Sequence, residues 1–159
     1  MSWISRYFHN KTASQPGIIQ LVKCKNKGGD GLACIAMIFA YYGIHISISH
    51  LYGHYPSLRK RIGLSDILDI LLAHEIASQP LHCKLKEVEQ VSLPAILFWG
   101  SEKFTILSEI IDEEYVVFDP TAGKLVLPKI EFERYYTEIV LQISPPAGSQ
   151  GIPLRCGAL

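Results

Sequence analysis

Several features that would assign a chemistry directly are missing from this sequence. The four cysteines form no CxxC pair and are irregularly spaced, which argues against a zinc site. We expect neither a metal nor a cofactor, and we interpret the cysteines as the reduced thiols of a cytosolic protein. They are Cys24, Cys34, Cys83 and Cys156.

Long apolar runs are also missing. The stretch 32–48 contains no charged residue, but it is fully apolar only as far as Tyr42. That is well short of the roughly 20 residues that a helix needs to span a bilayer. No apolar segment follows the charge in residues 1–6, so we expect no secretory signal and no membrane span.

The sequence has no excess of charge of either sign. Its 15 basic and 15 acidic residues give a formal net charge of +0, whereas domains that bind nucleic acids usually have a basic surface. We expect no nucleic-acid partner and interpret the basic run at 59–61 as a solvated turn. With 48% hydrophobic and 19% charged residues, the chain of 159 residues suits one globular domain with a real core.

What the sequence does contain is an apolar helix, which we predict over residues 30–43. Asp30 can cap its start and Gly43 can end it in a left-handed conformation, with no charged residue between them. A helix that is apolar all round is buried on every face. The helix dipole favours negative charge at the first turn. Some enzymes place a cysteine nucleophile there, because the helix dipole lowers the thiol pKa.

The rest of the chain predicts helices first and strands afterwards. A short helix is expected at 48–52, and another from Ser65 to Ile76, with Pro80 closing that section. A short helix is also expected after Pro128. Apolar runs between turn signals predict strands at 81–85, 94–99, 104–111, 115–118, 124–127 and 138–143. Helices followed by an antiparallel sheet predict an α+β fold. We divide the chain into a lead-in, one domain and a linker or tail, at residues 1–16, 17–144 and 145–159.

The predicted helix carries the motif of a known family. Residues 31–38, followed by Tyr41-Tyr42-Gly43, resemble the peptidase C39 family, close in pattern to the colicin V exporter group. These are the double-glycine peptidases at the N-terminus of bacteriocin-exporting ABC transporters. Their motif reads Glu/Asp-Cys-Gly-Leu-Ala-Cys-Leu-Ala-Met, with the first Cys as nucleophile. Later segments match in order and spacing, at 93–99, 104–107, 115–123 and 131–136. The resemblance covers about residues 16–145 and implies a papain-like cysteine-peptidase fold.

This chain departs from the family pattern at the catalytic positions. The nucleophilic Cys falls on Asp30 and the general-base His on Lys103. The Gln of the oxyanion hole falls on Cys24, and only Asp119 of the triad remains. Aspartate is a poor acyl-transfer nucleophile, and a lysine with an ordinary pKa is protonated and cannot act as the base. The resemblance therefore implies a site in which no catalytic set is intact.

The two main substitutions carry opposite charges, as a thiolate and an imidazolium would. We therefore hypothesise an ion pair between Asp30 and Lys103 at the helix N-terminus, with Asp119 near Lys103. We also expect Trp99, Lys103 and Asp30 to contribute to binding a peptide. For Trp99, core packing is an equally good interpretation.

Two alternatives involve other residues. Cys24 could be a relocated nucleophile with a histidine as its base, although we interpret it as a structural or loop thiol. His50 and His54 could bind a metal from one helical face, but no acidic residue nearby completes the ligand set, and we interpret them as structural. The candidate bases are His45, His50, His54, His74 and His82.

The resemblance and its departures lead to one expected function and two alternatives. We expect a catalytically inactive C39-like domain that binds a leader peptide or an unfolded export substrate in type I, ABC-transporter secretion of a bacteriocin or toxin. Such a domain would lie in the bacterial cytoplasm, at the inner membrane through its transporter. The alternatives are an active double-glycine leader peptidase with an unrecognised nucleophile, and an adaptor that binds a folded partner protein.

Overall fold

The computed structural model describes residues 17–25, 28–144 and 157–158, and the structural statements below concern these residues. The helices are α2 (Asp30–Tyr41), α3 (Ile48–His54), α4 (Leu64–Ala73) and α5 (Lys129–Tyr135), with the 3-10 helices η1 (Pro56–Arg59) and η2 (Leu85–Gln90). The strands are β1 (Ser78–His82), β2 (Ala95–Trp99), β3 (Lys103–Ile111), β4 (Glu114–Asp119), β5 (Gly123–Pro128), β6 (Tyr136–Ile143) and β7 (Gly157–Ala158).

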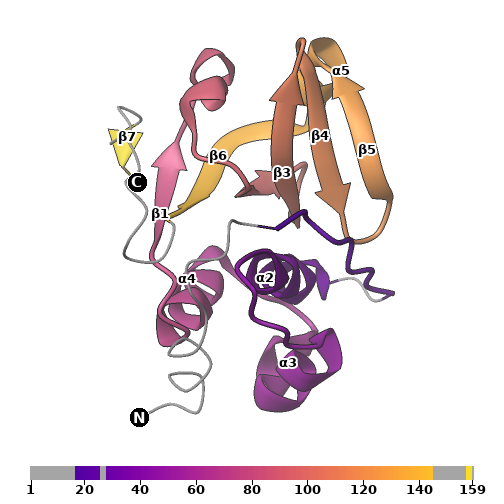
Figure 1. Ribbon diagram of the computed structural model, residues 1–159, viewed down its shortest axis with the longest axis vertical. Helices are drawn as coiled ribbons and strands as arrows, with labels where there is room; N and C mark the ends of the chain where they lie inside the picture. Colours follow the sequence, from indigo (N-terminus) through magenta and orange to yellow (C-terminus); the bar gives the residue numbers. More distant parts are fainter. Residues whose placement is uncertain (1–16, 26–27, 145–156, 159) are drawn as a thin grey trace.

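The strands form one antiparallel sheet in the order β5-β4-β3-β2-β6-β1-β7. Figure 1 shows α2, α3 and α4 grouped together on one side of the molecule, while α5 lies apart from them beside β5. The predicted α+β fold, with a helical half followed by an antiparallel sheet, is confirmed.

Strand alternation gives the sheet a buried core on each face. In β3, Phe104 and Ile106 pack with buried residues of α2 and α4. Leu107 lies on the other face, in a cluster that includes Trp99 and Phe132. Because both faces are covered in the middle of the sheet, the central strand β2 is apolar along its whole length.

α2 is the buried helix that the sequence predicts. Every residue from Asp30 to Phe39 is buried, and Gly43 follows the end of the helix with a φ of 81°. The start of the helix differs from the prediction. Gly29 is the N-cap residue, and Asp30 is the first residue of the helix itself. The Asp30 carboxylate is therefore available for a contact outside α2.

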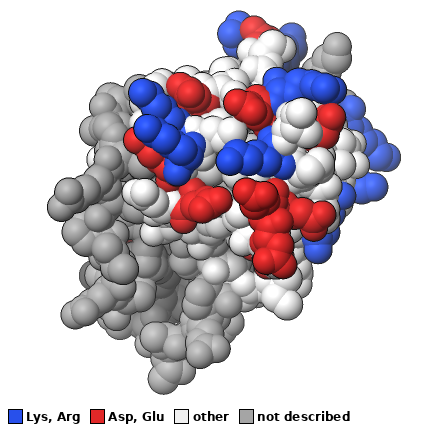
Figure 2. All heavy atoms as spheres, turned by 90° about the horizontal axis from the view of Figure 1, so that it is seen from above, with Lys and Arg blue, Asp and Glu red and all other residues white. Residues whose placement is uncertain are grey.

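Charges of both signs are mixed on the face of the molecule that Figure 2 shows. Lysine and arginine side chains alternate there with aspartate and glutamate, and no large area has one sign. The described side chains in this view therefore form no continuous basic surface.

Two boundaries in the middle of the chain differ from the prediction. α4 ends at Ala73 rather than at Ile76, and Glu75 beyond it has a φ of 62°, which a helix cannot continue through. Pro80 does not end a segment but lies inside β1, opposite Leu141 of β6.

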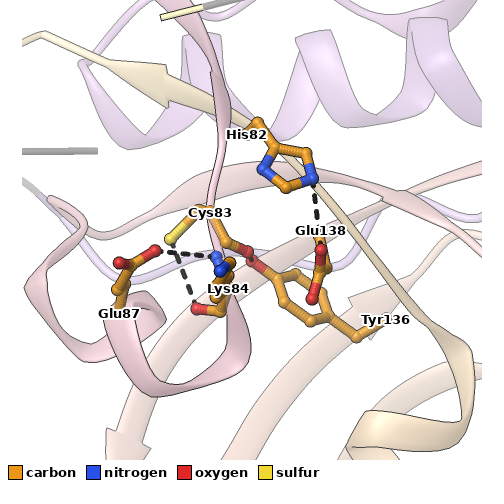
Figure 3. Close-up of polar contacts among 6 residues, drawn as sticks. All are labelled: His82, Cys83, Lys84, Glu87, Tyr136 and Glu138. Atoms are coloured by element: carbon orange, nitrogen blue, oxygen red, sulfur yellow. Dashed lines mark hydrogen bonds and ion pairs between the residues drawn. The ribbon is translucent and has the colours of Figure 1, made fainter. Parts of the chain in front are cut away.

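The strand expected at 81–85 ends at His82, because the 3-10 helix η2 begins three residues later. The backbone N–H of Lys84 donates to the Glu87 carboxylate at 3.0 Å and so caps the start of η2 (Figure 3). The Tyr136 hydroxyl donates to the Cys83 carbonyl at 2.6 Å and attaches this turn to β6.

The two ends of the chain are described only in part. Gly157–Ala158, inside the expected tail, forms β7 and pairs with β1. The expected lead-in over 1–16 and the rest of the tail lie outside the described residues, so the domain bounds stay a prediction. Among the helices that the structure describes, none has the length and apolar character needed to cross a bilayer.

Candidate functional site

Asp30 joins the helical half of the molecule to the sheet. It lies in the first turn of α2 with 6% of its surface exposed, and its Oδ2 accepts the backbone N–H of Phe104 in β3 at 2.6 Å. A carboxylate at this end of a helix also interacts favourably with the helix dipole. A short hydrogen bond to a charged acceptor is among the stronger ones in proteins. Asp30, at the position where the family motif would place the nucleophile, therefore makes a buried structural contact.

Lys103 precedes Phe104, but its side chain lies elsewhere. Its Nζ donates to the Thr121 hydroxyl at 3.2 Å, and the residue is exposed. The ion pairs among the described residues do not include one between Asp30 and Lys103, so that hypothesis is wrong. Successive residues of a strand lie on opposite faces, and Phe104 occupies the face that packs on α2. The Lys103 side chain is consequently on the other face.

Asp119 ends β4 and stabilises the turn that follows it. Its Oδ1 accepts three hydrogen bonds, from the Thr121 N–H at 2.7 Å, the Thr121 hydroxyl at 2.7 Å and the Ala122 N–H at 3.1 Å. An aspartate that bonds the backbone two residues ahead is a common turn device. The Thr121 hydroxyl thus links Lys103 to Asp119, and the carboxylate serves the β4–β5 turn.

Two cysteines lie in the same region. The Cys24 residue is buried, and its backbone N–H donates to the Pro120 carbonyl at 2.9 Å, which attaches the segment 17–25 to the β4–β5 turn. Cys34, one turn along α2 from Asp30, is fully buried. Burial raises the pKa of the Cys34 thiol well above its usual value, and the nearby charge of Asp30 raises it further. Cys34 is therefore held as a protonated, unreactive thiol.

The candidate histidine bases are spread over the molecule. His74 is buried, with Nδ1 2.7 Å from the Ile70 carbonyl, and His82 Nε2 lies 3.1 Å from a Glu138 carboxylate oxygen (Figure 3). The rings of His50 and His54 stack on α3 with their centroids 6.2 Å apart, and His45 is exposed. Within the described residues, no three His, Cys, Asp or Glu side chains are grouped so that they could hold a metal ion.

A pocket of about 580 Å³ opens on the sheet face away from α2. Its walls come from β2, β3, the ends of β4 and β5, and α5, and they combine apolar, aromatic and charged side chains. The lining residues are Trp99, Gly100, Ser101, Lys103, Asp119, Leu125, Leu127, Glu131 and Tyr135. Trp99 is nearly buried and also packs in the core, with its ring centroid 5.1 Å from that of Phe132 and 5.7 Å from that of Tyr135.

The pocket contains some of the predicted site residues and several that were not predicted. Trp99, Lys103 and Asp119 line it, whereas Asp30 and Cys24 do not. Sequence reasoning missed Leu125, Leu127 and Tyr135. The alternation of the two leucines along one strand was a signal for a shared face.

The sequence profile of the Peptidase C39 family matches residues 18–148. This chain belongs to the peptidase C39 family. The C39 domain is 30% identical over 115 residues to the probable microcin-H47 secretion/processing ATP-binding protein MchF of Escherichia coli, covering 72% of this chain and 16% of the relative. It is 29% identical over 125 residues to the colicin V secretion/processing ATP-binding protein CvaB of the same organism, covering 79% and 18%. The chain therefore spans less than a fifth of these relatives.

Solved structures of the family have the same fold. The C39 domain superposes on a double glycine motif protease from an AMS/PCAT transporter, crystallised with the leader peptide, with a TM-score of 0.75 and 18% identity, covering 84% of this chain and 96% of the other. The peptidase domain of Streptococcus ComA gives a TM-score of 0.71 at 16% identity, covering 80% and 98%. The papain-like fold that the resemblance implies is confirmed.

Proposed function

We propose that this C39 domain is non-catalytic and binds an extended segment of a leader peptide or export substrate for an ABC transporter that secretes a bacteriocin or toxin. The observation that carries the proposal is the hydrogen bond from the Phe104 N–H to the Asp30 carboxylate. A group that joins the two halves of the molecule from a buried position is not presented to a substrate carbonyl.

The remaining groups do not supply the missing chemistry. Thiol catalysis requires a thiolate within reach of a base that titrates near neutral pH. Lys103 has a hydroxyl as its hydrogen-bond partner, Asp119 is engaged by the β4–β5 turn, and Cys34 is held protonated by burial. These arrangements support a domain that has kept the family fold without its reaction.

The pocket supports binding of polypeptide. Trp99, Leu125, Leu127 and Tyr135 offer apolar surface for side chains, and Lys103 adds polar groups at the rim. Relatives named for bacteriocin secretion and processing, and a family structure crystallised with a leader peptide, favour the same class of ligand. We place the domain on the cytoplasmic side of the membrane, as part of a transporter or associated with one.

A binding measurement tests the proposal. Fluorescence anisotropy would follow a fluorescein-labelled leader peptide ending in Gly-Gly as the domain is titrated. We expect Tyr135→Ala to weaken binding about fivefold or more, because it removes an aromatic wall of the pocket. Ile130→Ala is the matched control, since Ile130 is an exposed residue of the same helix that does not line the pocket.

The outcomes separate the alternatives. Binding that weakens with Tyr135→Ala and not with Ile130→Ala supports the proposal. No binding of the leader by the unmodified domain would contradict it. Leader binding that neither variant changes would place the contact elsewhere and favour the adaptor alternative.

A further inference from the structure

β5 is the last strand at one end of the sheet, and none of the described residues pairs with its outer side (Figure 1). The opposite end differs, because β7 from the end of the chain pairs with β1 there. An antiparallel edge strand leaves the N–H and C=O groups of every second residue without a strand partner. Another extended backbone can form hydrogen bonds with such a row of groups.

The usual protections of an edge strand are few in β5. Its pairing with β4 runs in regular register from Asp119 opposite Gly123 to Glu114 opposite Pro128, without a bulge. Lys124 is the only charged residue in the strand, and proline occurs only at its last position. Natural sheets commonly block exposed edges with charges, bulges or prolines, so this edge is open to an added strand.

The side chains of β5 favour an apolar partner. Leu125 and Leu127 line the pocket, while Val126 on the other face is 52% exposed. A strand added beside β5 would bring alternate side chains to the pocket face, about 7 Å apart. The edge and the pocket thus form one continuous surface for an extended segment.

The charges near β5 favour the binding of some peptide segments over others. Lys124 lies near the start of β5 and Lys129 directly follows its end, while the acidic residues Asp119 and Glu131 lie in the pocket. The Lys124 ammonium lies over the Phe118 ring, 5.7 Å from its centroid, near the start of the strand. Acidic groups at the ends of a bound segment are favoured over basic ones, because like charges are disfavoured across an interface.

We propose that β5 binds its polypeptide ligand by strand addition, taking up an extended apolar segment with acidic residues at its ends and alternate side chains directed to the pocket. The inference rests on the proposed function and specifies how the ligand is held. Main-chain hydrogen bonds supply affinity in this mode, and the pocket supplies selectivity.

The first test is an N-methyl scan of a designed peptide. The probe is a fluorescein-labelled peptide of ten residues in which threonine and valine alternate between terminal glutamates, with one N-methyl group moved along the backbone. We expect binding to weaken about tenfold or more at every second position and to change little between, because only alternate N–H groups face β5. Absence of binding, or a loss that does not alternate, would overturn the inference.

The second test changes the edge. Val126→Lys places a charge on β5 at an exposed position that the fold tolerates, and it should weaken binding of the same peptide about tenfold. Ile130→Lys is the matched control, because it makes the same change at an exposed apolar residue of α5, and binding should stay within about twofold. A peptide ending in lysines should bind more weakly than the one ending in glutamates. Equal effects of the two variants would overturn the inference.

Two further outcomes are decisive. Sedimentation that shows a dimer of the unmodified domain, which Val126→Lys dissociates, would mean that a second copy covers the edge and would overturn strand addition by a peptide. If the Gly-Gly leader binds through the pocket but the N-methyl scan does not alternate, the inference fails and the proposed function stands. If the scan alternates but the leader does not bind, the proposed function fails and the peptide-binding edge stands.

Discussion

The side chain of Asp30 connects the first turn of α2 to the sheet. Its carboxylate keeps negative charge at the start of α2, where the helix dipole favours it, and accepts a backbone N–H from β3. Both partners are buried, so loss of the acceptor would leave the Phe104 N–H without this partner in an apolar setting.

The Asp30→Ala variant should therefore be destabilised. We expect its free energy of unfolding to fall by about 1–3 kcal/mol, the usual cost of leaving a buried donor unsatisfied, as measured by urea denaturation. Asp69→Ala is the control, because Asp69 is an exposed residue on α4, and it should stay within about 0.5 kcal/mol of the unmodified domain. Equal stabilities of the two variants would contradict the structural role of Asp30.

The raised pKa of Cys34 gives a prediction about reactivity and pH. Because the thiolate is disfavoured in the folded state, iodoacetamide at pH 8 should leave Cys34 unmodified until the domain is unfolded in guanidinium, as peptide mass spectrometry would show. A pKa raised by folding also means that this thiol's contribution to stability falls as the pH rises above about 8.5, the ordinary cysteine value. Rapid alkylation of Cys34 in the folded domain would contradict this account.

At the scale of elements, the start of α2 depends on a close approach. A Cβ at Gly31 would collide with the Cγ2 methyl of Ile62, which is itself buried. We expect Gly31→Ala to cost about 1–3 kcal/mol of stability through overpacking, measured by thermal or urea unfolding.

Gly53 provides the matched control for that change. It lies inside α3, and a Cβ there would meet nothing within 4 Å. Gly53→Ala should therefore leave stability unchanged or raise it by about 0.5–1 kcal/mol, because alanine loses less backbone entropy in a helix. Destabilisation by both variants alike would contradict the packing argument.

The junction between β1 and η2 depends on β6. Removing the Tyr136 hydroxyl removes the donor to the Cys83 carbonyl, so Tyr136→Phe should lower the free energy of unfolding by about 1 kcal/mol (Figure 3). Tyr135→Phe makes the same chemical change at the preceding, more exposed residue and should have an effect below about 0.5 kcal/mol. A larger loss for Tyr135→Phe would show that the junction is held in another way.

Local signals explain which elements were predictable. α2 and the strands β2 to β5 have apolar runs bounded by turn residues, and their predicted positions agree with the structure within a few residues. The end of β1 was predicted wrongly, because it depends on the capping of η2 by Glu87 and on a contact to β6. The spacing of apolar residues in the sequence indicates neither contact.

The site was less predictable than the fold for a physical reason. The family motif brought attention to Asp30, Lys103 and Asp119, and the structure places them around the start of β3 and the β4–β5 turn. The register of β3 decides that the Phe104 N–H, and not the Lys103 ammonium, meets Asp30. Charge complementarity alone predicted an ion pair, because a sequence does not show which face of the strand each residue occupies.

At the scale of the whole molecule, the C39 fold is retained, and Asp30 joins the helical half to the sheet. The pocket lies on the opposite face of the sheet from that contact, and β5 is at one end of the sheet. The proposed absence of catalysis and the proposed binding surface are therefore compatible within one domain.

The most direct test of this account is a cleavage assay with a double-glycine precursor, followed by mass spectrometry, with the double glycine motif protease from the AMS/PCAT transporter as the positive control. The account predicts that the precursor binds to the domain and stays intact under conditions in which the control reaction is complete. A product cut after Gly-Gly, formed by the purified domain, would contradict it.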